Sequence, residues 1–371
     1  MASAEIEEKT GRITELLERE QLGGVILNAQ HNFAWLTGGK TNGIDLSREN
    51  GAASLLVTRT GKRFLLANNI ETPRMLAEEV SAEDFEPVDF TWQEEKAVGD
   101  TALKKAKSLA NGEIVTDIPM FAETAAIEGK IAACRYKLTD DELVRIHELG
   151  RDAGLLIQTA IGEIEPGDTE LAIAAKIRFA FSKRNIASVV TLVAADERIA
   201  GFRHPVPTEN PWKKTVLMVT CAKRFGIIVS LSRIVCVGPI PAELQRLTEA
   251  NAAVNSALYA ATREGTTGAK LYEAAAKAYK ENGFASEIDK HHQGGAAGYK
   301  TREWVAHPES REIVHIGQAF AWNPSITGTK VEETIVTTDQ GIEVITASPD
   351  HPRIETVIDG QTYFSPGVLS I

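Results

Sequence analysis

The hydrophobic residues of the first third of the chain recur with periods that alternate between those of helix and strand. The N-terminal segment places four apolar residues on one face of a helix: Ile6, Ile13, Leu16 and Leu17. Two apolar runs at 53–57 and 63–67 flank Thr60 and Gly61, which is typical of a β-hairpin. Similar patterns predict strands at 25–27 and 113–117 and helices at 70–79 and 101–110. This alternation predicts a small α/β domain.

A new pattern begins near residue 139. Thr139 and Glu142 have the spacing of a capping box, in which the Thr side chain accepts from the amide three residues on and the Glu reaches back. The long helix that follows has these apolar positions: Leu143, Val144, Ile146, Leu149, Leu155 and Leu156. Because 371 residues are too many for one ordinary core, we predict two domains, residues 1–138 and 139–371.

The second predicted domain repeats its own pattern. Gly167 begins a helix that runs through Phe181, and Gly265, about 98 residues later, begins a similar helix through Tyr279. Each helix follows a longer helix and precedes strands, which include those expected at 188–195 and 215–222. Two further strands are expected within 329–346, joined by a turn at 339–341. The repeat predicts an α+β domain with internal pseudo-twofold symmetry.

Composition and charge narrow the class of protein. The net charge of −11 argues against a nucleic-acid or anionic-membrane partner, because both require a basic face. Three cysteines form neither a disulfide framework nor a zinc cluster, and they suit a reducing compartment. The N-terminus has no apolar core that could act as a signal peptide, and no run is long enough to span a bilayer. We therefore expect a cytoplasmic protein.

Five segments stand in the order found in a known family. They are HNFAWLTG at 31–38, the strand pair VLMVTC and SLSRI at 216–221 and 230–234, GGAAG at 294–298, FAWNP at 320–324 and KVEET at 330–334. In these segments the chain resembles the creatinase/aminopeptidase P/prolidase family, peptidase family M24. The resemblance covers essentially the whole chain, and it implies a pita-bread domain preceded by a smaller α/β domain. It also implies a homodimer.

The departures from the family pattern fall on its metal ligands. The peptidases of the family hold two divalent metal ions with two Asp, one His and two Glu. The matching positions here are Val219 or Thr220 (the strand is one residue short), Ser230, Gly295, Asn323 and Glu332. Glu332 alone is a carboxylate, and one carboxylate cannot hold two metal ions. We therefore expect no metal and no other cofactor.

Creatinase, a metal-free member of the family, suggests which residues would replace the metals. The segment FRHP places His204 where the family keeps an active-site His, and its ordinary pKa suits a general acid or base. His291 and His292 precede the glycine-rich segment, and if they lie on a strand only one of them, for which we choose His291, faces the cavity. Glu332 is expected to orient an imidazole. Cys221 lacks an activating partner and is expected to be a core residue.

Several other residues are candidates for substrate contacts. Arg302 matches the creatinase Arg that grips the substrate carboxylate, and it could bind a carboxylate through two hydrogen bonds. The remaining candidates are Thr220, Ser230, His292, Glu303, Asn323 and Trp35. Each also has an ordinary structural interpretation, as a common strand residue, a turn residue, a surface charge or an aromatic residue of the core.

The sequence thus suggests a metal-independent hydrolase that cleaves a C–N bond of a small carboxylated molecule, with His204, Glu332 and His291 as catalytic residues. Three alternatives remain open. They are a non-catalytic peptide- or protein-binding relative, a lyase acting on a small carboxylic acid, and an Xaa-Pro-type metalloaminopeptidase whose ligands stand at shifted positions.

Overall fold

A computed structural model describes residues 3–371 of the chain. The chain divides into two compact units, Met1–Arg135 (unit 1) and Tyr136–Ile371 (unit 2). Within residues 3–371, none of the helices has the length and apolar character needed to cross a bilayer.

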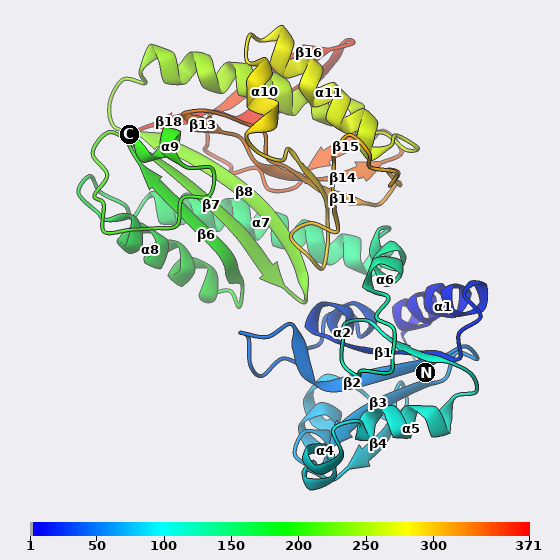
Figure 1. Ribbon diagram of the computed structural model, residues 1–371. Helices are drawn as coiled ribbons and strands as arrows, with labels where there is room; N and C mark the ends of the chain where they lie inside the picture. The colour runs from blue at the N-terminus through cyan, green and yellow to red at the C-terminus, as the bar shows by residue number, and fades with distance from the viewer. Residues whose placement is uncertain (1–2) are drawn as a thin grey trace. The chain divides into compact units, whose positions relative to one another are not determined.

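Unit 1 is built on a mixed five-stranded sheet with the strand order β4-β3-β2-β1-β5 (Figure 1). Its strands are β1 (Gly24–Ala29), β2 (Asn50–Thr58), β3 (Arg63–Asn68), β4 (Glu86–Phe90) and β5 (Ile114–Thr116). Its helices are α1 (Ala4–Arg19), α2 (Gln30–Leu36), α3 (Thr72–Arg74), a π-helical turn (Met75–Glu79), α4 (Trp92–Val98), α5 (Thr101–Leu109) and α6 (Glu128–Arg135). The predicted hairpin is confirmed, because β2 and β3 pair antiparallel around Thr60 and Gly61.

The first helix shows how the sequence pattern becomes structure. The side chain of Ser3 accepts from the amide of Ile6, which caps the helix at its N-terminus. The predicted apolar stripe of α1 is buried. Inside the same unit, Lys9 donates to Glu5 Oε1 and to the carbonyl oxygen of Trp35, each at 2.6 Å.

Unit 2 contains a mixed four-stranded sheet, an antiparallel five-stranded sheet and the helices that cover them. One sheet has the order β18-β8-β7-β6 and the other β10-β9-β11-β14-β15. The strands of the first sheet are β6 (Ala187–Ala195), β7 (Thr215–Arg224), β8 (Ile227–Cys236) and β18 (Val368–Ser370), of which β18 runs parallel to β8. Those of the second are β9 (Gly294–Ala297), β10 (Trp304–Val305), β11 (Ala319–Trp322), β14 (Glu333–Thr338) and β15 (Gly341–Val344).

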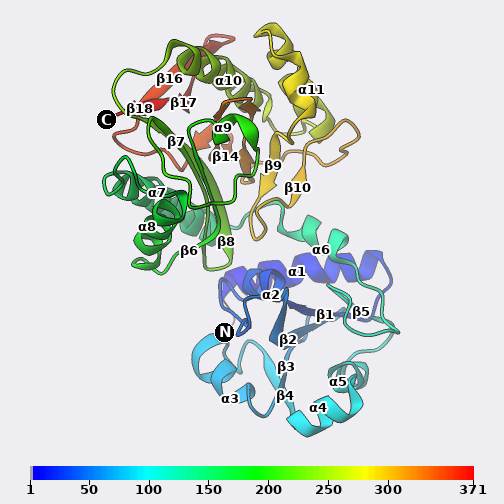
Figure 2. The same ribbon diagram turned by 60° about the vertical axis from the view of Figure 1, so that its left-hand side comes forward.

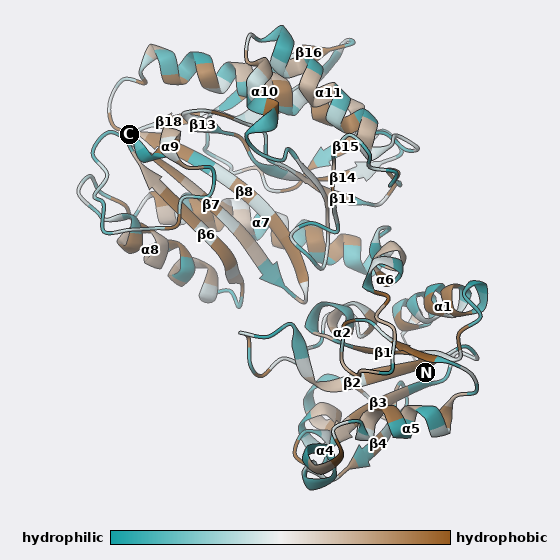
Figure 3. Ribbon diagram, in the orientation of Figure 1, coloured by the Kyte–Doolittle hydropathy of each residue, from teal (hydrophilic) through white to brown (hydrophobic). Residues whose placement is uncertain are grey.

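The remaining elements of unit 2 connect and cover these sheets. The helices are α7 (Asp140–Ile161), α8 (Glu170–Ser182), α9 (Arg198–Gly201), α10 (Ala242–Ala261), α11 (Gly268–Glu281) and a 3₁₀ turn (Ala285–Asp289). Two short hairpins complete the unit: β12 (Ser325–Ile326) with β13 (Thr329–Lys330), and β16 (Arg353–Ile358) with β17 (Gln361–Pro366). In Figure 3, strands β7 and β8 are brown, that is hydrophobic, along most of their length, whereas the helices alternate between brown and teal. This pattern is expected for buried strands covered by amphipathic helices.

The internal repeat is visible in local geometry. Gly167 and Gly265 both have positive φ (100° and 78°), a conformation that glycine adopts at little cost. Two residues after each of these glycines, a Thr caps the next helix. The side chain of Thr169 accepts from the amide of Ala172, and that of Thr267 accepts from the amide of Lys270. Each Thr also forms an isolated β-bridge, to Pro211 and to Ile313 respectively. The two halves therefore begin their second helices in the same way.

The long helix of unit 2 differs from its prediction in one respect. Its capping box forms as expected between Thr139 and Glu142. However, Val144 and Leu155 are 59% and 46% exposed. The buried face is instead completed by the small residues Gly150 and Gly154, where an added Cβ would collide with the backbone of residues 345–347. An apolar-residue count misses such a face because glycine contributes no hydrophobicity.

Candidate functional site

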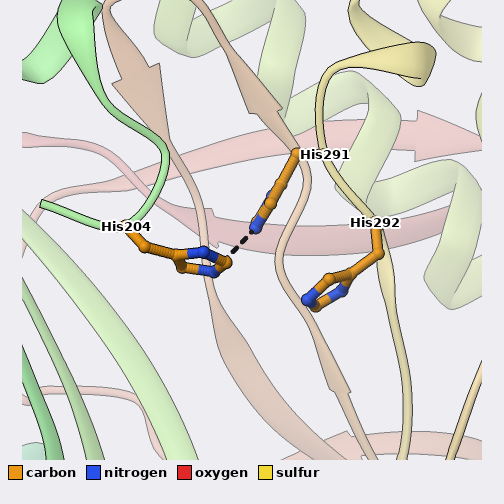
Figure 4. A group of neighbouring side chains, drawn as sticks. All are labelled: His204, His291 and His292. Carbon is orange, nitrogen blue, oxygen red and sulfur yellow. Dashed lines mark hydrogen bonds between the residues drawn. The ribbon is translucent and has the colours of Figure 1, made fainter.

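Three histidines of unit 2 meet at one point. The ring nitrogens of His204, His291 and His292 all lie within 4.8 Å of one another. Nε2 of His204 is 3.2 Å from Nε2 of His291, and the rings of His291 and His292 lie 4.6 Å apart between centroids. Figure 4 shows the three side chains pointing toward a common space. His204 and His292 are exposed and His291 is half-buried, so the cluster is accessible from solvent.

The expectation that only one of His291 and His292 faces the site is wrong. The expectation assumed a strand, in which neighbouring side chains point to opposite faces. The two residues instead lie in a bend between the 3₁₀ turn and β9, where this alternation does not apply. Gln293 fixes the bend by donating to the carbonyl oxygen of His291, and Ser325 lies 3.3 Å from Nδ1 of the same ring.

Their surroundings keep all three imidazoles uncharged at neutral pH. Burial, reinforced by the charge of Lys330, lowers the pKa of His291 to about 2. Burial and the charge of Arg302 lower the pKa of His292 to about 4. Burial and Lys330 also lower the pKa of His204, although Glu332 acts in the opposite direction. A neutral imidazole is the form that binds a metal ion.

An ion-paired triad of Arg302, Glu332 and Lys330 lies close enough to influence these histidines. Glu332 is buried, with Oε1 3.0 Å from Arg302 Nη2 and Oε2 3.0 Å from Lys330 Nζ. Burial alone would raise the pKa of Glu332, but the charges of Lys330 and Arg302 outweigh it and lower the pKa. The triad therefore carries one excess positive charge. Lys330 was missed as a site residue, although it stands two residues before Glu332 in the motif KVEET.

Asn323 lies just beyond β11, and its backbone amide donates to the carbonyl oxygen of Gln293. Its side-chain Oδ1 is buried and has no hydrogen-bond partner among residues 3–371. Gly294 makes this packing possible, because its φ is 105° and an added Cβ would collide with Ala321 and crowd Asn323. Most buried acceptors in proteins have a donor, so this unpaired oxygen sets Asn323 apart from an ordinary turn residue.

The side chains of Ser230 and Thr220 point to opposite faces of the sheet formed by β7 and β8. Ser230 pairs with Cys221 across β7 and β8, and its hydroxyl donates to Cys221 Sγ at 3.2 Å. Burial raises the pKa of the Cys221 thiol, and the charge of Glu332 adds to this effect, so Cys221 lies on the Glu332 side. Thr220 must then face the other side, where it lies 2.8 Å from the Ser188 hydroxyl. Thr220 is thus buried beside Ser188, and its substrate contact stays a prediction.

Two other candidates also have structural partners. The side chain of Glu303 accepts from the amide of Tyr299 at 3.0 Å, and this hydrogen bond stabilises the loop between the two residues. Trp35 belongs to unit 1, where its side chain is fully buried and Lys9 lies 5.8 Å from its ring centroid. A fully buried side chain has no surface to offer a substrate. Its role as a substrate contact is therefore not supported by the packing.

The residues present fit one metal ion better than two. At the positions that the resemblance matches to the five ligands of a dinuclear centre, the only carboxylate is Glu332, and two cations already neutralise it. These side chains do not fit a pair of divalent ions. The three imidazoles do fit a single ion, since three protein ligands and an open position are the usual pattern of a catalytic zinc site. The loss of the dinuclear ligand set stays a prediction that metal content can test.

Two family models match this chain. Residues 9–136 match the creatinase/prolidase N-terminal domain, and residues 145–339, more than half of the chain, match metallopeptidase family M24. The chain belongs to metallopeptidase family M24. The predicted M24 family and the pita-bread fold, preceded by a smaller N-terminal domain, are thereby confirmed.

Individual M24 relatives are peptidases by name. An Xaa-Pro dipeptidase of Lactobacillus delbrueckii subsp. lactis is 25% identical over 227 residues, which cover 58% of this chain and 61% of that protein. The chain therefore matches about three fifths of the length of this curated relative. Among solved structures, the prolidase of Thermococcus sibiricus (TM-score 0.78, 18% identity, covering 94% of this chain and 98% of that one) has the same fold. So does the dipeptidase PepE of Mycobacterium ulcerans (TM-score 0.78, 16% identity, covering all of both chains).

These comparisons correct the functional interpretation of the sequence. The hypothesis of a metal-independent hydrolase is wrong, because the chain belongs to a metallopeptidase family and its curated relative is an Xaa-Pro dipeptidase. The alternative of an Xaa-Pro-type metalloaminopeptidase with ligands at shifted positions agrees better with these findings. The unmatched ligand positions do not exclude a metal ion, because His204, His291 and His292 could form a ligand set of their own.

Proposed function

We propose that this M24 protein is a metal-dependent hydrolase of peptide C–N bonds in short peptides. Its single metal ion would be held by His204, His291 and His292 rather than at the ligand positions of the dinuclear peptidases. The observation that carries the proposal is the convergence of three accessible, uncharged imidazoles within 4.8 Å. Membership of a metallopeptidase family and the dipeptidase relative support the reaction class.

When bound, an ion at such a site supplies Lewis-acid polarisation of the substrate carbonyl group. The chain's own residues would do the rest. Ser325, close to Nδ1 of His291, would help to fix the orientation of that ring, as outer partners of metal-binding histidines usually do. The exposed edges of His204 and His292 would leave one side of the cluster open to substrate.

Arg302 and Lys330 would give the site its preference for an anionic group. Together with Glu332 they carry one excess positive charge beside the histidines. This charge suits the C-terminal carboxylate of a dipeptide. The same charge opposes a cation, so we expect moderate metal affinity and room for one ion, not two.

Dipeptidase activity tests the proposal. The full-length protein should hydrolyse an Xaa-Pro dipeptide such as Ala-Pro, lose this activity on dialysis against a chelator, and regain it when a divalent metal is restored. Because outer-shell changes already cost metal sites about 10–100-fold, His292→Ala should lower the activity by at least about 100-fold.

The matched control is His307→Ala, which removes an exposed histidine of the same unit that lies outside the cluster. Its activity should equal that of the wild type. Full activity in His292→Ala, or activity that survives metal removal, would contradict the proposal. The homodimer and the cytoplasmic location stay predictions.

A further inference from the structure

Three segments of unit 2 that are far apart in the sequence are joined at one buried carboxylate, that of Glu287. This residue lies in the 3₁₀ turn Ala285–Asp289 and is 6% exposed. The segments are the loop after α9, the bend before β9 and the hairpin of β12 and β13. Helix α9 and strand β9, from which the first two segments can be located, are labelled in Figure 2.

The loop after α9 is joined to Glu287 through Arg203. Nη2 of Arg203 donates to Oε2 of Glu287 and, at 2.9 Å, to the hydroxyl oxygen of Thr327. Arg203 stands directly before His204, which is the member of the histidine cluster that this loop provides. The ion pair therefore acts one residue away from the cluster.

The bend before β9 is joined to the same carboxylate through Lys290. Its Nζ donates to Oε1 of Glu287 at 2.7 Å, and its backbone amide donates to the carbonyl oxygen of Glu287 at 3.1 Å. Lys290 stands directly before His291, as Arg203 does before His204. On both segments, the residue that contacts Glu287 is thus the neighbour of a clustered histidine.

The hairpin of β12 and β13 completes the junction through Thr327. The backbone amide of Thr327 donates to Oε2 of Glu287 at 3.1 Å, and its hydroxyl lies 3.1 Å from each of the two carboxylate oxygens. The same hairpin carries Ser325, whose hydroxyl lies 3.3 Å from Nδ1 of His291. All three segments therefore hold or contact a ring of the cluster.

The charge of Glu287 is needed at this junction. Burial raises its pKa, but the hydrogen bonds from Lys290, Arg203 and Thr327 outweigh burial and lower the pKa, so the carboxylate is ionised at neutral pH. Without this negative charge, the side chains of Arg203 and Lys290 would repel each other and lose their common acceptor.

A second junction joins two of the three segments but not the loop of His204. The hydroxyl of Tyr279 lies 2.7 Å from Oε1 of Gln293, in the bend, and accepts from the amide of Ser325, in the hairpin, at 2.9 Å. The loop is joined to this region by Arg203 and by the contact of His204 with His291. Loss of the Glu287 carboxylate should therefore release His204 more than His291.

We propose that Glu287 is a positioning residue of the histidine cluster. It holds the loop of His204 against the bend of His291 and His292, so that the three imidazoles stand ready for one metal ion. The part that concerns the ion rests on the proposed function, whereas the placement of His204 does not.

Titration of the full-length protein with Co²⁺ tests this role, because the visible absorption of bound cobalt reports the geometry of its ligands. The wild type should bind one equivalent. Glu287→Gln keeps the size of the side chain but removes its charge. It should bind cobalt at least about tenfold more weakly and with an altered spectrum, since loss of an outer partner costs metal sites about 10–100-fold. Glu281→Gln, at an exposed position of α11 beside Lys277, is the matched control and should bind as the wild type does.

Arg203→Met tests the same link without removing the buried carboxylate, which Lys290 and Thr327 still contact. It should also weaken cobalt binding by at least about tenfold. Thermal unfolding shows which variants are folded, and Arg203→Met decides the matter if Glu287→Gln is not.

A readout without metal comes from nuclear magnetic resonance of the imidazole nitrogens. In the metal-free protein, the signals of His204 should move in Glu287→Gln and in Arg203→Met, whereas those of His351, whose ring contacts Gly367, should stay.

The outcomes separate this inference from the proposed function. If the wild type binds cobalt and the folded variants bind it with the same affinity and spectrum, the role of Glu287 is overturned and the metal site stands. If the wild type binds no cobalt, the proposed function fails, and the nitrogen signals alone decide the inference. Signals of His204 that are unchanged in both variants would overturn it.

Discussion

Single residues decide the electrostatics of the histidine cluster, and Lys330 is the most telling of them. It is 7% exposed, pairs with Glu332, and its charge helps to lower the pKa of each of the three histidines. The same charge repels a bound cation. The positive side chain therefore sets a limit on metal affinity that no ligand count reveals.

Replacing this lysine should strengthen metal binding. The variant Lys330→Met keeps an apolar side chain but removes the positive charge, so less positive charge remains to neutralise the carboxylate of Glu332. We therefore expect the affinity for a divalent metal to rise by at least about tenfold. Competition with a chromophoric chelator measures the change. Lys277→Met, at an exposed position of α11, is the control and should have no effect. An unchanged or lower affinity in Lys330→Met would place the metal elsewhere.

His351 makes a separate prediction about pH. Burial and the charge of Arg233 lower its pKa to about 4 in the folded protein, below its ordinary value of 6.5. The unfolded state then binds the proton more readily, so this residue's contribution to stability is lost as the pH falls from about 6.5 toward 4. Between pH 7.5 and pH 5 the loss should be of the order of 1–2 kcal/mol.

The variant His351→Gln isolates this contribution. Glutamine can still donate to the carbonyl oxygen of Gly367 but does not titrate. The difference in free energy of unfolding between wild type and variant, measured with denaturant at the two pH values, should change in favour of the variant at pH 5. If the difference is the same at both pH values, His351 is not held neutral as described.

At the scale of elements, the pairing of β9 with β11 depends on Gly294. Its φ of 105° is unfavourable for other residues, and a Cβ would also meet the carbonyl oxygen of Ala321. Gly294→Ala should therefore cost more than about 2 kcal/mol of stability, the sum of backbone strain and collision. Gly283 has a φ of 84° but open space around it, so Gly283→Ala should cost only about 1–2 kcal/mol. Equal costs in thermal unfolding would show that the collision is relieved by a backbone shift.

Regular elements were predictable from the sequence to different degrees. The first helix, the β2–β3 hairpin and the capping box of α7 follow from local patterns, because each depends on neighbours within a few residues. The face of α7 was predicted less well, since Gly150 and Gly154 pack by being small. The segment at 291–293 was the poorest case, because a bend set by the Gln293 side chain has no period to detect.

The candidate site shows the same limit more clearly. His204, His291, Arg302 and Glu332 could be named from motifs, and the structure brings them into one region of unit 2. The contact between His204 and His291 could not be predicted, because 87 residues of sequence separate them. His204 lies in a loop after α9, and His291 lies in a bend before β9. Matching positions to a family's ligands shows which ligands are missing. It does not show that other side chains have converged nearby.

For the whole molecule, we expect an M24 protein whose metal centre has moved within a retained fold. The most direct test is the metal content of the full-length protein isolated without chelators, measured by mass spectrometry of the elements together with His204→Ala, His291→Ala and the control His307→Ala. We predict about one equivalent of a divalent transition metal in the wild type and in the control, and its loss in the other two variants. Two equivalents that persist in His204→Ala and His291→Ala would contradict the account, and so would a protein that binds no metal even when it is supplied.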